Sequence, residues 1–510
     1  MNALRRWSSA LAIALAAAAC VPAAPTAPLA APTQTPVGPA VPSGSAPAPQ
    51  VQWTPTPDEP FRQQPPAPST ESPWTAPIPE QSTLSNGMKL LVVSRPKLPI
   101  TVIYLATRRG SDTEPLPGLG SFTGEMLSQG TKSRPALQLS DELENLGAEH
   151  QSWMDWDSGN LWVKVLSQHF DKALELMADM LQHPAFDKPE VERLRSQRLA
   201  AISQQADVPD VILRNSVARV TFKGHPYGQP LVGTKESVAK ITPELIRSFY
   251  EARFTPDQMI AVVVGDVTPQ VASERLEKAF GGWKTKARPA APVPTPPAVR
   301  REIVLIDRPE AAQANIALAG PGVPRITKDF DAILVANTIL GGMFSSRLNM
   351  NLREKHAWTY GARSSFDMRH GAGPFSAGAA VDTPNAVAAI REMLVELDQF
   401  SKGQVTDDEL SLARGTLIKS LPGRFESNGS TAGSIASLGI WGLPLDEYRT
   451  RPERLQKVTA SDVQKVASIY FDPKKLRIIV VGDRSKLEED LKALKFGPIV
   501  HLDAEGKPVR

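Results

Sequence analysis

Histidine side chains are the ones that most often hold a catalytic metal ion. In this chain the histidines do not occur at the spacing of a helical metal site. The seven histidines are His150, His169, His183, His225, His356, His370 and His501. No two of them lie three or four residues apart, the spacing that puts two imidazoles on one face of a helix. The sequence therefore predicts no metal ion in this chain, and surface or hydrogen-bonded histidines instead.

A single cysteine, Cys20, excludes an internal disulfide and directly follows an apolar run. Two arginines precede this run, residues 11–19, which is too short to span a bilayer. Residues 1–20 are therefore predicted to be a signal peptide. They resemble a bacterial lipoprotein signal, in which Cys20 would be acylated and would anchor the protein to a membrane. Ordinary cleavage after Ala19 or Ala24, giving a soluble exported protein, is the alternative; either route predicts the periplasm or the outer membrane.

The composition favours a large globular protein that does not bind nucleic acid. The chain has 510 residues, of which 41% are hydrophobic, so two or more packed domains are expected. The formal net charge is only +3, with acidic and basic residues interspersed. Nucleic-acid binding needs a basic face or run, and the folded part of this chain has none.

Two proline-rich segments divide the chain. Residues 21–72 are rich in Pro, Ala, Thr and Ser and cannot bury a core, so they are predicted to be a disordered tether. Residues 286–300 are predicted to be a linker. Between and after these segments we expect an N-terminal domain, residues 73–285, and a C-terminal domain, residues 301–510.

The two predicted domains contain an internal repeat. Residues 241–266, "ITPELIRSFYEARFTPDQMIAVVVGD", align without gaps with residues 458–483, "VTASDVQKVASIYFDPKKLRIIVVGD". In each copy a threonine N-cap, Thr242 or Thr459, opens an amphipathic helix, and a β-branched strand ends at Gly-Asp. The duplication indicates a common architecture for the two domains.

The remaining periodic segments give the fold class. Strands are predicted at residues 88–94 and 101–107 in the first domain, and at 301–307 and 314–320 in the second. Long helices are predicted within 187–203 and 406–422, the latter opened by a capping box of Thr406 and Glu409. Strands come early and late, with helices between them. This order predicts an α+β fold of two homologous domains, each a mainly antiparallel sheet with helices packed on one face.

Four motifs in order resemble the insulinase-like peptidases, which include pitrilysin and the mitochondrial processing peptidase. They are "LSNGMKLLVVSRPKLPITVIYLATRRGS" (84–111), "GLGSFTGEMLSQGT" (118–131), "GHPYGQPLVGT" (224–234) and "LGGMFSSRLNMNLREKHAWTYGARSSF" (340–366). The resemblance covers roughly residues 80–505. It implies the two-domain processing-peptidase fold.

The resemblance also implies that the metal site is lost. Active members carry His-x-x-Glu-His on the first-domain helix, where two histidines hold zinc and the glutamate activates water. On this chain the first histidine position is Ser121, the general-base position is Gly124 and the second histidine position is Glu125. The third ligand falls on Ala200 or Ala201. This set cannot hold zinc, so the stretch is expected to be a packing helix.

The second domain keeps the residues that active members place opposite the zinc. By resemblance, Arg353 and Tyr360 are the arginine and tyrosine near the scissile bond, where they can donate hydrogen bonds to the developing oxyanion. Gly341 and Gly342 resemble a glycine-rich loop that binds substrate in the processing peptidases. A plain helix terminus and turn is the alternative for these glycines.

These features together predict a non-catalytic subunit of an exported heterodimeric zinc endopeptidase. Such a subunit would bind peptide, added as a strand to a sheet edge, and would complete the site of a partner that carries zinc and an intact His-x-x-Glu-His. The first alternative is an inert scaffold or peptide-binding protein of the same fold. The second is a hydrolase with an unrecognised site.

Overall fold

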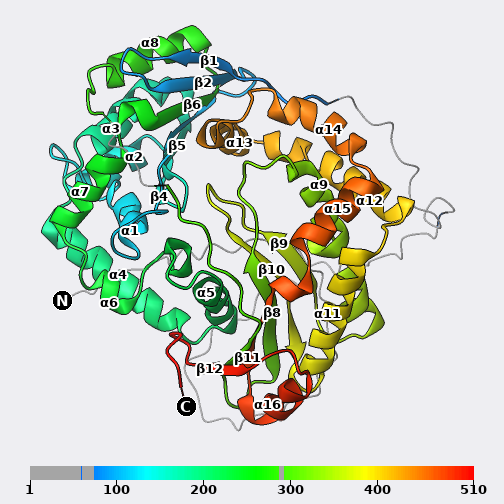
Figure 1. The fold of residues 1–510 in the computed structure, drawn as a ribbon. Coiled ribbons are helices and arrows are strands. Elements are labelled where there is room, and N and C mark those ends of the chain that lie inside the picture. Colours follow the sequence, from blue (N-terminus) through cyan, green and yellow to red (C-terminus); the bar gives the residue numbers. More distant parts are fainter. Residues whose placement is uncertain (1–58, 60–73, 287–291, 510) are drawn as a thin grey trace, which may run out of the picture. The chain divides into compact units, whose positions relative to one another are not determined.

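The computed structural model describes residues 59, 74–286 and 292–509 (Figure 1). Apart from Glu59, these residues lie in one compact unit, residues 72–510. The predicted signal peptide with Cys20 lies outside the described residues, as does the predicted tether apart from Glu59, and so do residues 287–291 of the predicted linker. We call residues 74–286 the first half and residues 292–509 the second half.

Each half is built on one six-stranded sheet within the described residues. The first sheet has the order β1-β2-β6-β3-β5-β4, in which only β2 and β6 run parallel. The predicted strands of the first half correspond to β2 and β3. The strands are β1 (Glu80–Thr83), β2 (Lys89–Ser94), β3 (Ile100–Thr107), β4 (Glu149–Met154), β5 (Gly159–Leu166) and β6 (Met259–Gly265).

The second sheet has the order β12-β7-β11-β8-β10-β9, in which β7 runs parallel to both β11 and β12. The other pairs are antiparallel, so both sheets are mainly antiparallel, as predicted, with a parallel component. The strands are β7 (Ile303–Asp307), β8 (Gln313–Pro321), β9 (Ala362–Phe366), β10 (Pro374–Asp382), β11 (Arg477–Gly482) and β12 (Ile499–Leu502).

Helices fill the chain between the early and the late strands of each half (Figure 1). Those of the first half are α1 (Leu119–Met126), α2 (Ala136–Asn145), α3 (Phe170–Gln182), α4 (Lys188–Gln205), α5 (Pro209–Thr221), α6 (Lys235–Val238), α7 (Pro243–Arg253) and α8 (Pro269–Phe280). Those of the second half are α9 (Phe330–Asn337), α10 (Arg347–Asn349), α11 (Ala386–Lys402), α12 (Asp407–Lys419), α13 (Asn428–Trp441), α14 (Glu447–Lys457), α15 (Ala460–Tyr470) and α16 (Arg484–Ala493). Short helical turns are η2 (Ser167–His169), η3 (Pro226–Gly228), η4 (Pro256–Gln258), η5 (Thr338–Gly342), η6 (Met350–Lys355), η7 (Thr383–Asn385), η8 (Pro422–Phe425) and η9 (Pro473–Lys475), of which η5 and η6 are π-helical.

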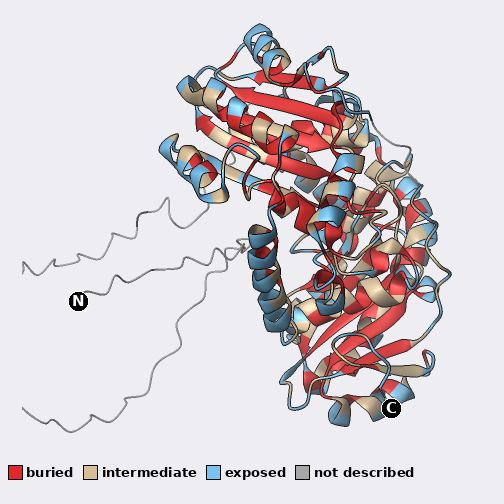
Figure 2. Ribbon diagram, turned by 90° about the vertical axis from the view of Figure 1, so that its left-hand side faces the viewer, coloured by how far each residue is buried: buried red, intermediate tan, exposed pale blue. Residues whose placement is uncertain are grey.

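The central strands are buried on both faces, which explains their unbroken apolar sequences. In β6, Ala261 and Val263 join the core beneath the helices of the first half, whereas Val262 and Val264 face the opposite side. Residues of β11 alternate in the same way between two cores. Figure 2 shows the strands coloured mostly as buried.

The expectation that helices cover one face of each sheet was incomplete. Each half contributes one helix to the sheet of the other half. Helix α13 of the second half packs on β3 and β6 of the first sheet, and α5 of the first half packs on β8 and β11 of the second. Ala432 and Ile435 of α13 are buried there, and Ile212 of α5 is buried in the corresponding core. The local pattern of a strand cannot tell which distant helix will cover it.

The internal repeat is confirmed at the level of its hydrogen bonds. The Thr242 hydroxyl accepts the N–H of Leu245 at the start of α7, and the Thr459 hydroxyl accepts the N–H of Asp462 at the start of α15. The predicted capping box of Thr406 and Glu409 also forms, at the start of α12.

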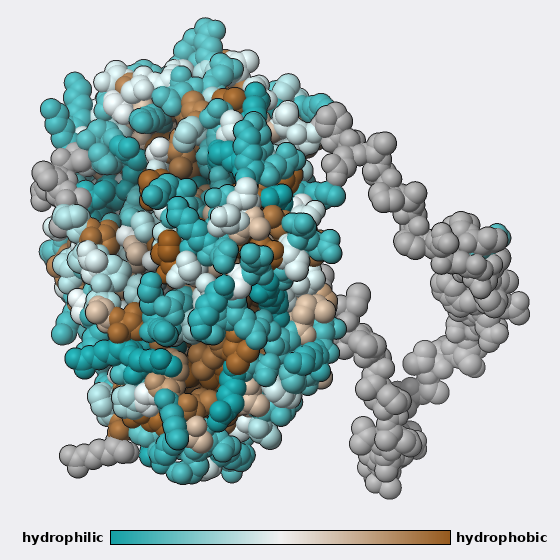
Figure 3. Space-filling view, turned by 45° about the vertical axis from the view of Figure 1, so that its right-hand side comes forward, coloured by the Kyte–Doolittle hydropathy of each residue, from teal (hydrophilic) through white to brown (hydrophobic). Residues whose placement is uncertain are grey.

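Hydrophilic side chains predominate on the face drawn in Figure 3, and apolar side chains gather there in limited patches. Of the helices in the described ranges, none combines the length and the apolar character that a membrane span requires.

Candidate functional site

The helix that corresponds to the degenerate motif is α1, and its start is tightly fixed. The Glu114 carboxylate accepts the N–H groups of Gly118 at 2.8 Å and Gly120 at 2.7 Å. Burial raises the pKa of Glu114 to about 7, although these two hydrogen bonds act in the opposite direction. Gly118 has φ 85° and lies against Gly233 of the loop 224–234, so a side chain at Gly118 would be strained and would clash. The loop 224–234, the third of the four family motifs, therefore helps to fix the position of α1.

An arginine occupies the space between the two former histidine positions. Arg198 reaches across from α4, donates to the Ser121 hydroxyl at 2.7 Å and pairs with the Glu125 carboxylate. Its guanidinium carbon lies 5.2 Å from the centre of the Phe122 ring, and the residue is only 6% exposed. The Ser121 hydroxyl in turn donates to the Leu231 carbonyl at 2.7 Å. Burial lowers the pKa of Arg198, and Glu125 partly offsets this.

The general-base position, Gly124, leaves no room for a side chain. A Cβ atom there would lie 2.5 Å from the backbone nitrogen of Met154 and 2.5 Å from the carbonyl carbon of Trp153, both on β4. Real Cβ atoms do not approach backbone so closely, so α1 packs on β4 only because residue 124 is glycine. The activating carboxylate is therefore both missing and sterically excluded.

The predicted third ligand position on α4 does not contact α1 through Ala200 or Ala201. Ala200 and Ala201 are exposed, and the residue of α4 that faces α1 is Arg198. The signal was present in the sequence, because Val191, Leu194 and Arg198 are spaced to share the buried face of α4. A basic residue on an apolar stripe indicated an acidic or polar partner on the facing helix.

The residues present do not fit a zinc ion. Ser121 and Glu125, at the two former histidine positions of α1, are both engaged by a cationic guanidinium, which would repel a divalent cation. Throughout the described ranges, no three His, Cys, Asp or Glu side chains are grouped so that they could hold a metal ion.

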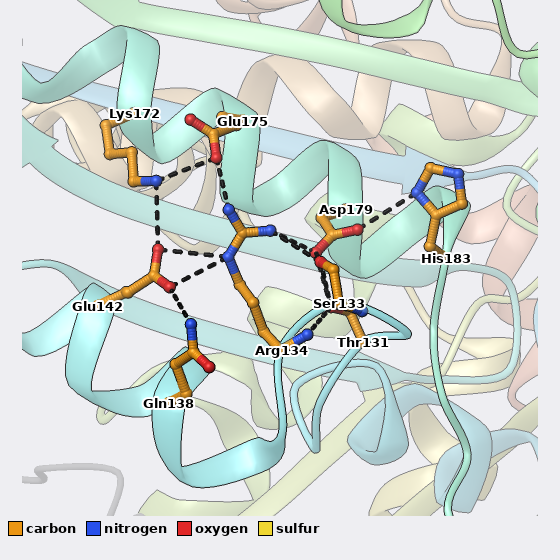
Figure 4. Close-up of polar contacts among 9 residues, drawn as sticks. All are labelled: Thr131, Ser133, Arg134, Gln138, Glu142, Lys172, Glu175, Asp179 and His183. Carbon is orange, nitrogen blue, oxygen red and sulfur yellow. Dashed lines mark hydrogen bonds and ion pairs between the residues drawn. The ribbon is translucent and has the colours of Figure 1, made fainter.

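The segment after α1 is anchored by a charge network at α3 (Figure 4). The Asp179 carboxylate accepts from the Thr131 and Ser133 hydroxyls and from Arg134, each at 2.6 Å. Arg134 also pairs with Glu142 at 3.2 Å. Because donors and acceptors are matched within this network, it holds the loop in place and offers no reactive group.

The two residues predicted to act opposite a zinc ion lie on either side of a short loop before β9. Arg353 lies in η6, where its guanidinium carbon is 4.7 Å from the centre of the Phe344 ring and its Nε is 3.3 Å from Glu354. Tyr360 is 90% exposed. In the part of the chain that the structure describes, no hydrogen bond joins the two side chains.

The glycines of the second half form a helix end rather than an open loop. Gly341 and Gly342 end η5, and Gly341 is buried so tightly against Ser364 of β9 that it leaves no space for a Cβ atom. This contact repeats that of Gly124 with β4 in the first half. The backbone that Gly341 approaches is therefore the protein's own β9.

Strands β4 and β9, each at one end of its sheet, differ in whether their free edge is open to an added strand. In β9 the Ala362 N–H donates to the Asn349 side chain at 3.1 Å, and the Ser364 carbonyl accepts from Asn337 at 3.0 Å. These asparagines close part of its outer edge. Within the described residues, β4 pairs with β5 alone, so its other edge has no strand partner.

Comparisons with known proteins agree with this arrangement. The family model described as insulinase (peptidase family M16) matches residues 94–235, and the model described as peptidase M16 inactive domain matches residues 240–417. The uncharacterized zinc protease YmxG of Bacillus subtilis is 24% identical over 387 residues, which cover 75% of this chain and 93% of that protein. An uncharacterized zinc protease of Streptomyces coelicolor is 26% identical over 397 residues, which cover 76% of this chain and 86% of that protein.

Solved structures share the fold. A peptidase M16 inactive domain from Pseudomonas fluorescens matches with a TM-score of 0.75 and 24% identity, covering 79% of this chain and 98% of that chain. A protease from Helicobacter pylori matches with a TM-score of 0.73 and 22% identity, covering 80% of this chain and 100% of that chain. The predicted α+β architecture of two homologous domains is thereby confirmed.

Proposed function

Because this chain belongs to the insulinase family of peptidases, M16, and its own residues do not fit zinc, we propose that it is the non-catalytic subunit of an exported heterodimeric zinc metalloendopeptidase. Its partner is a related chain that carries zinc and an intact His-x-x-Glu-His motif. This chain binds the peptide substrate and supplies Arg353 and Tyr360 to the partner's site.

One observation supports the proposal: the Arg198 guanidinium contacts both Ser121 and Glu125, which by resemblance correspond to the two metal-binding histidines of active members. A chain that had merely lost ligands would leave a polar gap. Here the buried arginine is satisfied by Ser121 and Glu125, and Gly124 lets α1 lie directly on β4. The first half is thus packed for stability without a metal ion.

The second half supports a role in a partner's site. A phenol that is 90% exposed gains nothing for the fold of the single chain, but its hydroxyl is free to donate to a substrate carbonyl. Arg353, whose side chain is 40% exposed, can rotate away from Glu354 to do the same. Losing one such donor typically lowers the rate on the order of a hundredfold.

The substrate peptide is proposed to add as a strand to the open edge of β4. Main-chain hydrogen bonds to an unpaired strand bind peptides with little dependence on their side chains. The partly closed edge of β9 is less suited to this, because two of its main-chain groups are already bonded to asparagine side chains.

Export and anchoring remain proposals that rest on the sequence. The apolar run that ends at Cys20 supports a lipoprotein signal, and the proline-rich residues 21–72 would give the folded unit reach from a membrane. The competing function is an inert scaffold of the same fold. The exposed Tyr360 favours the subunit role over the scaffold.

The test is reconstitution with a relative from the same genome that has an intact His-x-x-Glu-His. We expect an unfolded peptide to be cleaved by the mixture and by neither chain alone, with cleavage lost on Arg353→Ala. Arg391→Ala, which removes an exposed arginine on α11, is the matched control and should leave cleavage intact. A complex that forms but never cleaves would favour the scaffold.

A further inference from the structure

A cavity of about 480 Å³ lies in the second half, between the end of β9 and helices α9, α13 and α14. Its lining is unusual in pairing cations with aromatic rings. The cations are Arg325, Arg424 and Arg451, and the rings are Phe330, Phe366, Trp441 and Tyr448. Only one carboxylate, Asp367, reaches the wall, and it is paired with Arg369 at 3.0 Å through the arginine Nε.

The nearby buried carboxylate does not neutralise this cavity. Glu447 accepts from Arg451 at 2.6 Å and from Arg454 at 2.9 Å. Arg325 lies 3.8 Å from the same oxygen, too far for a hydrogen bond. Arg454 has a second partner, Asp331, at 2.8 Å. Two carboxylates, Glu447 and Asp331, thus face the three arginines, and this group of side chains retains one positive charge.

Arg325 lines the cavity, and the ion pair with Glu447 at 3.8 Å is too long to satisfy its donors with a hydrogen bond. Its guanidinium carbon lies 3.7 Å from the centre of the Phe330 ring, and only 13% of the side chain is exposed. Within the described residues, its side-chain nitrogens donate no hydrogen bond. Burial lowers the pKa of Arg325, and the neighbouring Arg451 lowers it further. Arg424, on the rim, is exposed and has no side-chain partner in the described ranges.

We propose that this cavity binds a carboxylate of the peptide substrate, held by Arg325 and Arg424 and flanked by the aromatic rings. A planar carboxylate matches the paired donors of a guanidinium and would supply the counter-charge that Glu447 cannot. The aromatic wall, including Trp441 and Tyr448, suits the apolar part of the same residue. The inference rests on the proposed peptide-binding function and adds to it a preference for acidic peptides.

The carboxylate can come from the peptide C-terminus or from an acidic side chain, and the test separates the two. Fluorescence anisotropy measures binding of the full chain to labelled versions of one unstructured peptide. The first has a free C-terminus and no acidic side chain, the second has a C-terminal amide and one internal glutamate, and the third has an amide and no acid. We expect at least one acidic version to bind roughly tenfold more tightly than the neutral version.

Arg325→Met should abolish this difference, since it keeps an apolar side chain against Phe330 but removes the charge. Arg424→Gln, at an exposed position on which the fold does not depend, should reduce it. The matched control is Arg301→Gln, because Arg301 also lies over a phenylalanine ring, Phe496, at 4.3 Å, but does not line the cavity. This variant should retain the full preference.

Equal binding of all three peptides, or a preference that survives both Arg325→Met and Arg424→Gln, overturns the assignment. These results are distinguishable from failure of the proposed function. If the chain completes a partner's activity without a preference for acidic peptides, only the cavity assignment fails. If acidic peptides bind through Arg325 but no partner is activated, the cavity assignment holds and the subunit role fails.

Discussion

Arg198 on α4 and Glu125 on α1 form an ion pair that links the two helices, and Glu125 stands at the position that by resemblance corresponds to the second histidine of the family motif. The arginine is almost fully buried, whereas the glutamate side chain is 43% exposed. The pair therefore links α4 to α1. The buried arginine depends on this pairing more than the glutamate does, because the glutamate side chain can also be solvated. The chain itself thus supplies the cation at this contact between the two helices.

Removing the arginine should cost stability. Arg198→Ala leaves Ser121 without a donor and opens a gap beside Phe122, so we expect a loss of about 2 kcal/mol in the free energy of unfolding, below that of a fully buried pair because Glu125 can be solvated. Urea unfolding measures this. Arg193→Ala, an exposed arginine on the same helix that pairs with Glu190, should cost under about 0.5 kcal/mol. Equal losses in the two variants would contradict the assigned role.

Adding a methyl group at the former general-base position should also destabilise. Gly124→Ala places a Cβ atom against the backbone of β4, so we expect a loss of about 2 kcal/mol or more and a lower Tm. The control is Gly415→Ala in α12, where a Cβ atom meets nothing within 4 Å. That variant should gain up to about 1 kcal/mol through helix propensity. A neutral Gly124→Ala would show that α1 is not seated on β4 as described.

The pKa of Glu114 predicts a pH dependence with a definite sign. Because burial raises the pKa of this group from 4.5 to about 7 in the folded state, the folded protein binds the extra proton more tightly than the unfolded chain. This contribution to stability is fully present below pH 4.5 and is lost as the pH rises through about 7, by roughly 3 kcal/mol. Glu114→Gln should remove the part of the decline in stability with rising pH that comes from this group.

Thermal unfolding between pH 4.5 and 7.5 in steps measures the difference between the variant and the parent. Glu251→Gln on α7 replaces an exposed carboxylate and serves as the control, with a profile that should follow the parent. Profiles of Glu114→Gln and the parent that stay parallel over this range would show that Glu114 titrates as an ordinary carboxylate.

Substitution of Tyr360 should lower the activity of the reconstituted pair without changing the stability of this chain. Because its side chain is 90% exposed and its hydroxyl has no partner within the described residues, Tyr360→Phe should change the free energy of unfolding by less than about 0.5 kcal/mol. In the reconstituted pair the same variant should lower kcat on the order of a hundredfold with little change in KM. Tyr470→Phe, which removes a hydroxyl bonded to Asp329 at 2.8 Å, should leave kcat unchanged. A Tyr360→Phe pair with full activity would remove this residue from the partner's site.

Much of the fold could be predicted from local pattern and from the internal repeat. The caps at Thr242, Thr406 and Thr459, and the strands that end at Gly265 and Gly482, follow from short-range rules that operate within one turn or one strand. The packing of α5 on the second sheet and of α13 on the first could not be predicted, because it depends on contacts between segments that are distant in sequence.

The contacts of the candidate site could be predicted only in part. The sequence identifies Ser121, Gly124 and Glu125 as the positions of the degenerate motif, but not that Arg198 contacts both Ser121 and Glu125. That assignment requires the crossing of α1 and α4, which fixes which residue of α4 faces Ser121. Likewise, the sequence left both a substrate-binding loop and a helix terminus open for Gly341, and the structure shows a helix terminus packed on the backbone of β9.

The most direct test of the account is the zinc content and peptidase activity of the purified full chain. Elemental analysis after dialysis against zinc should find well under one zinc per chain, with no peptide hydrolysis until the relative that carries His-x-x-Glu-His is added. One tightly bound zinc per chain, together with peptide cleavage by this chain alone, would contradict the account.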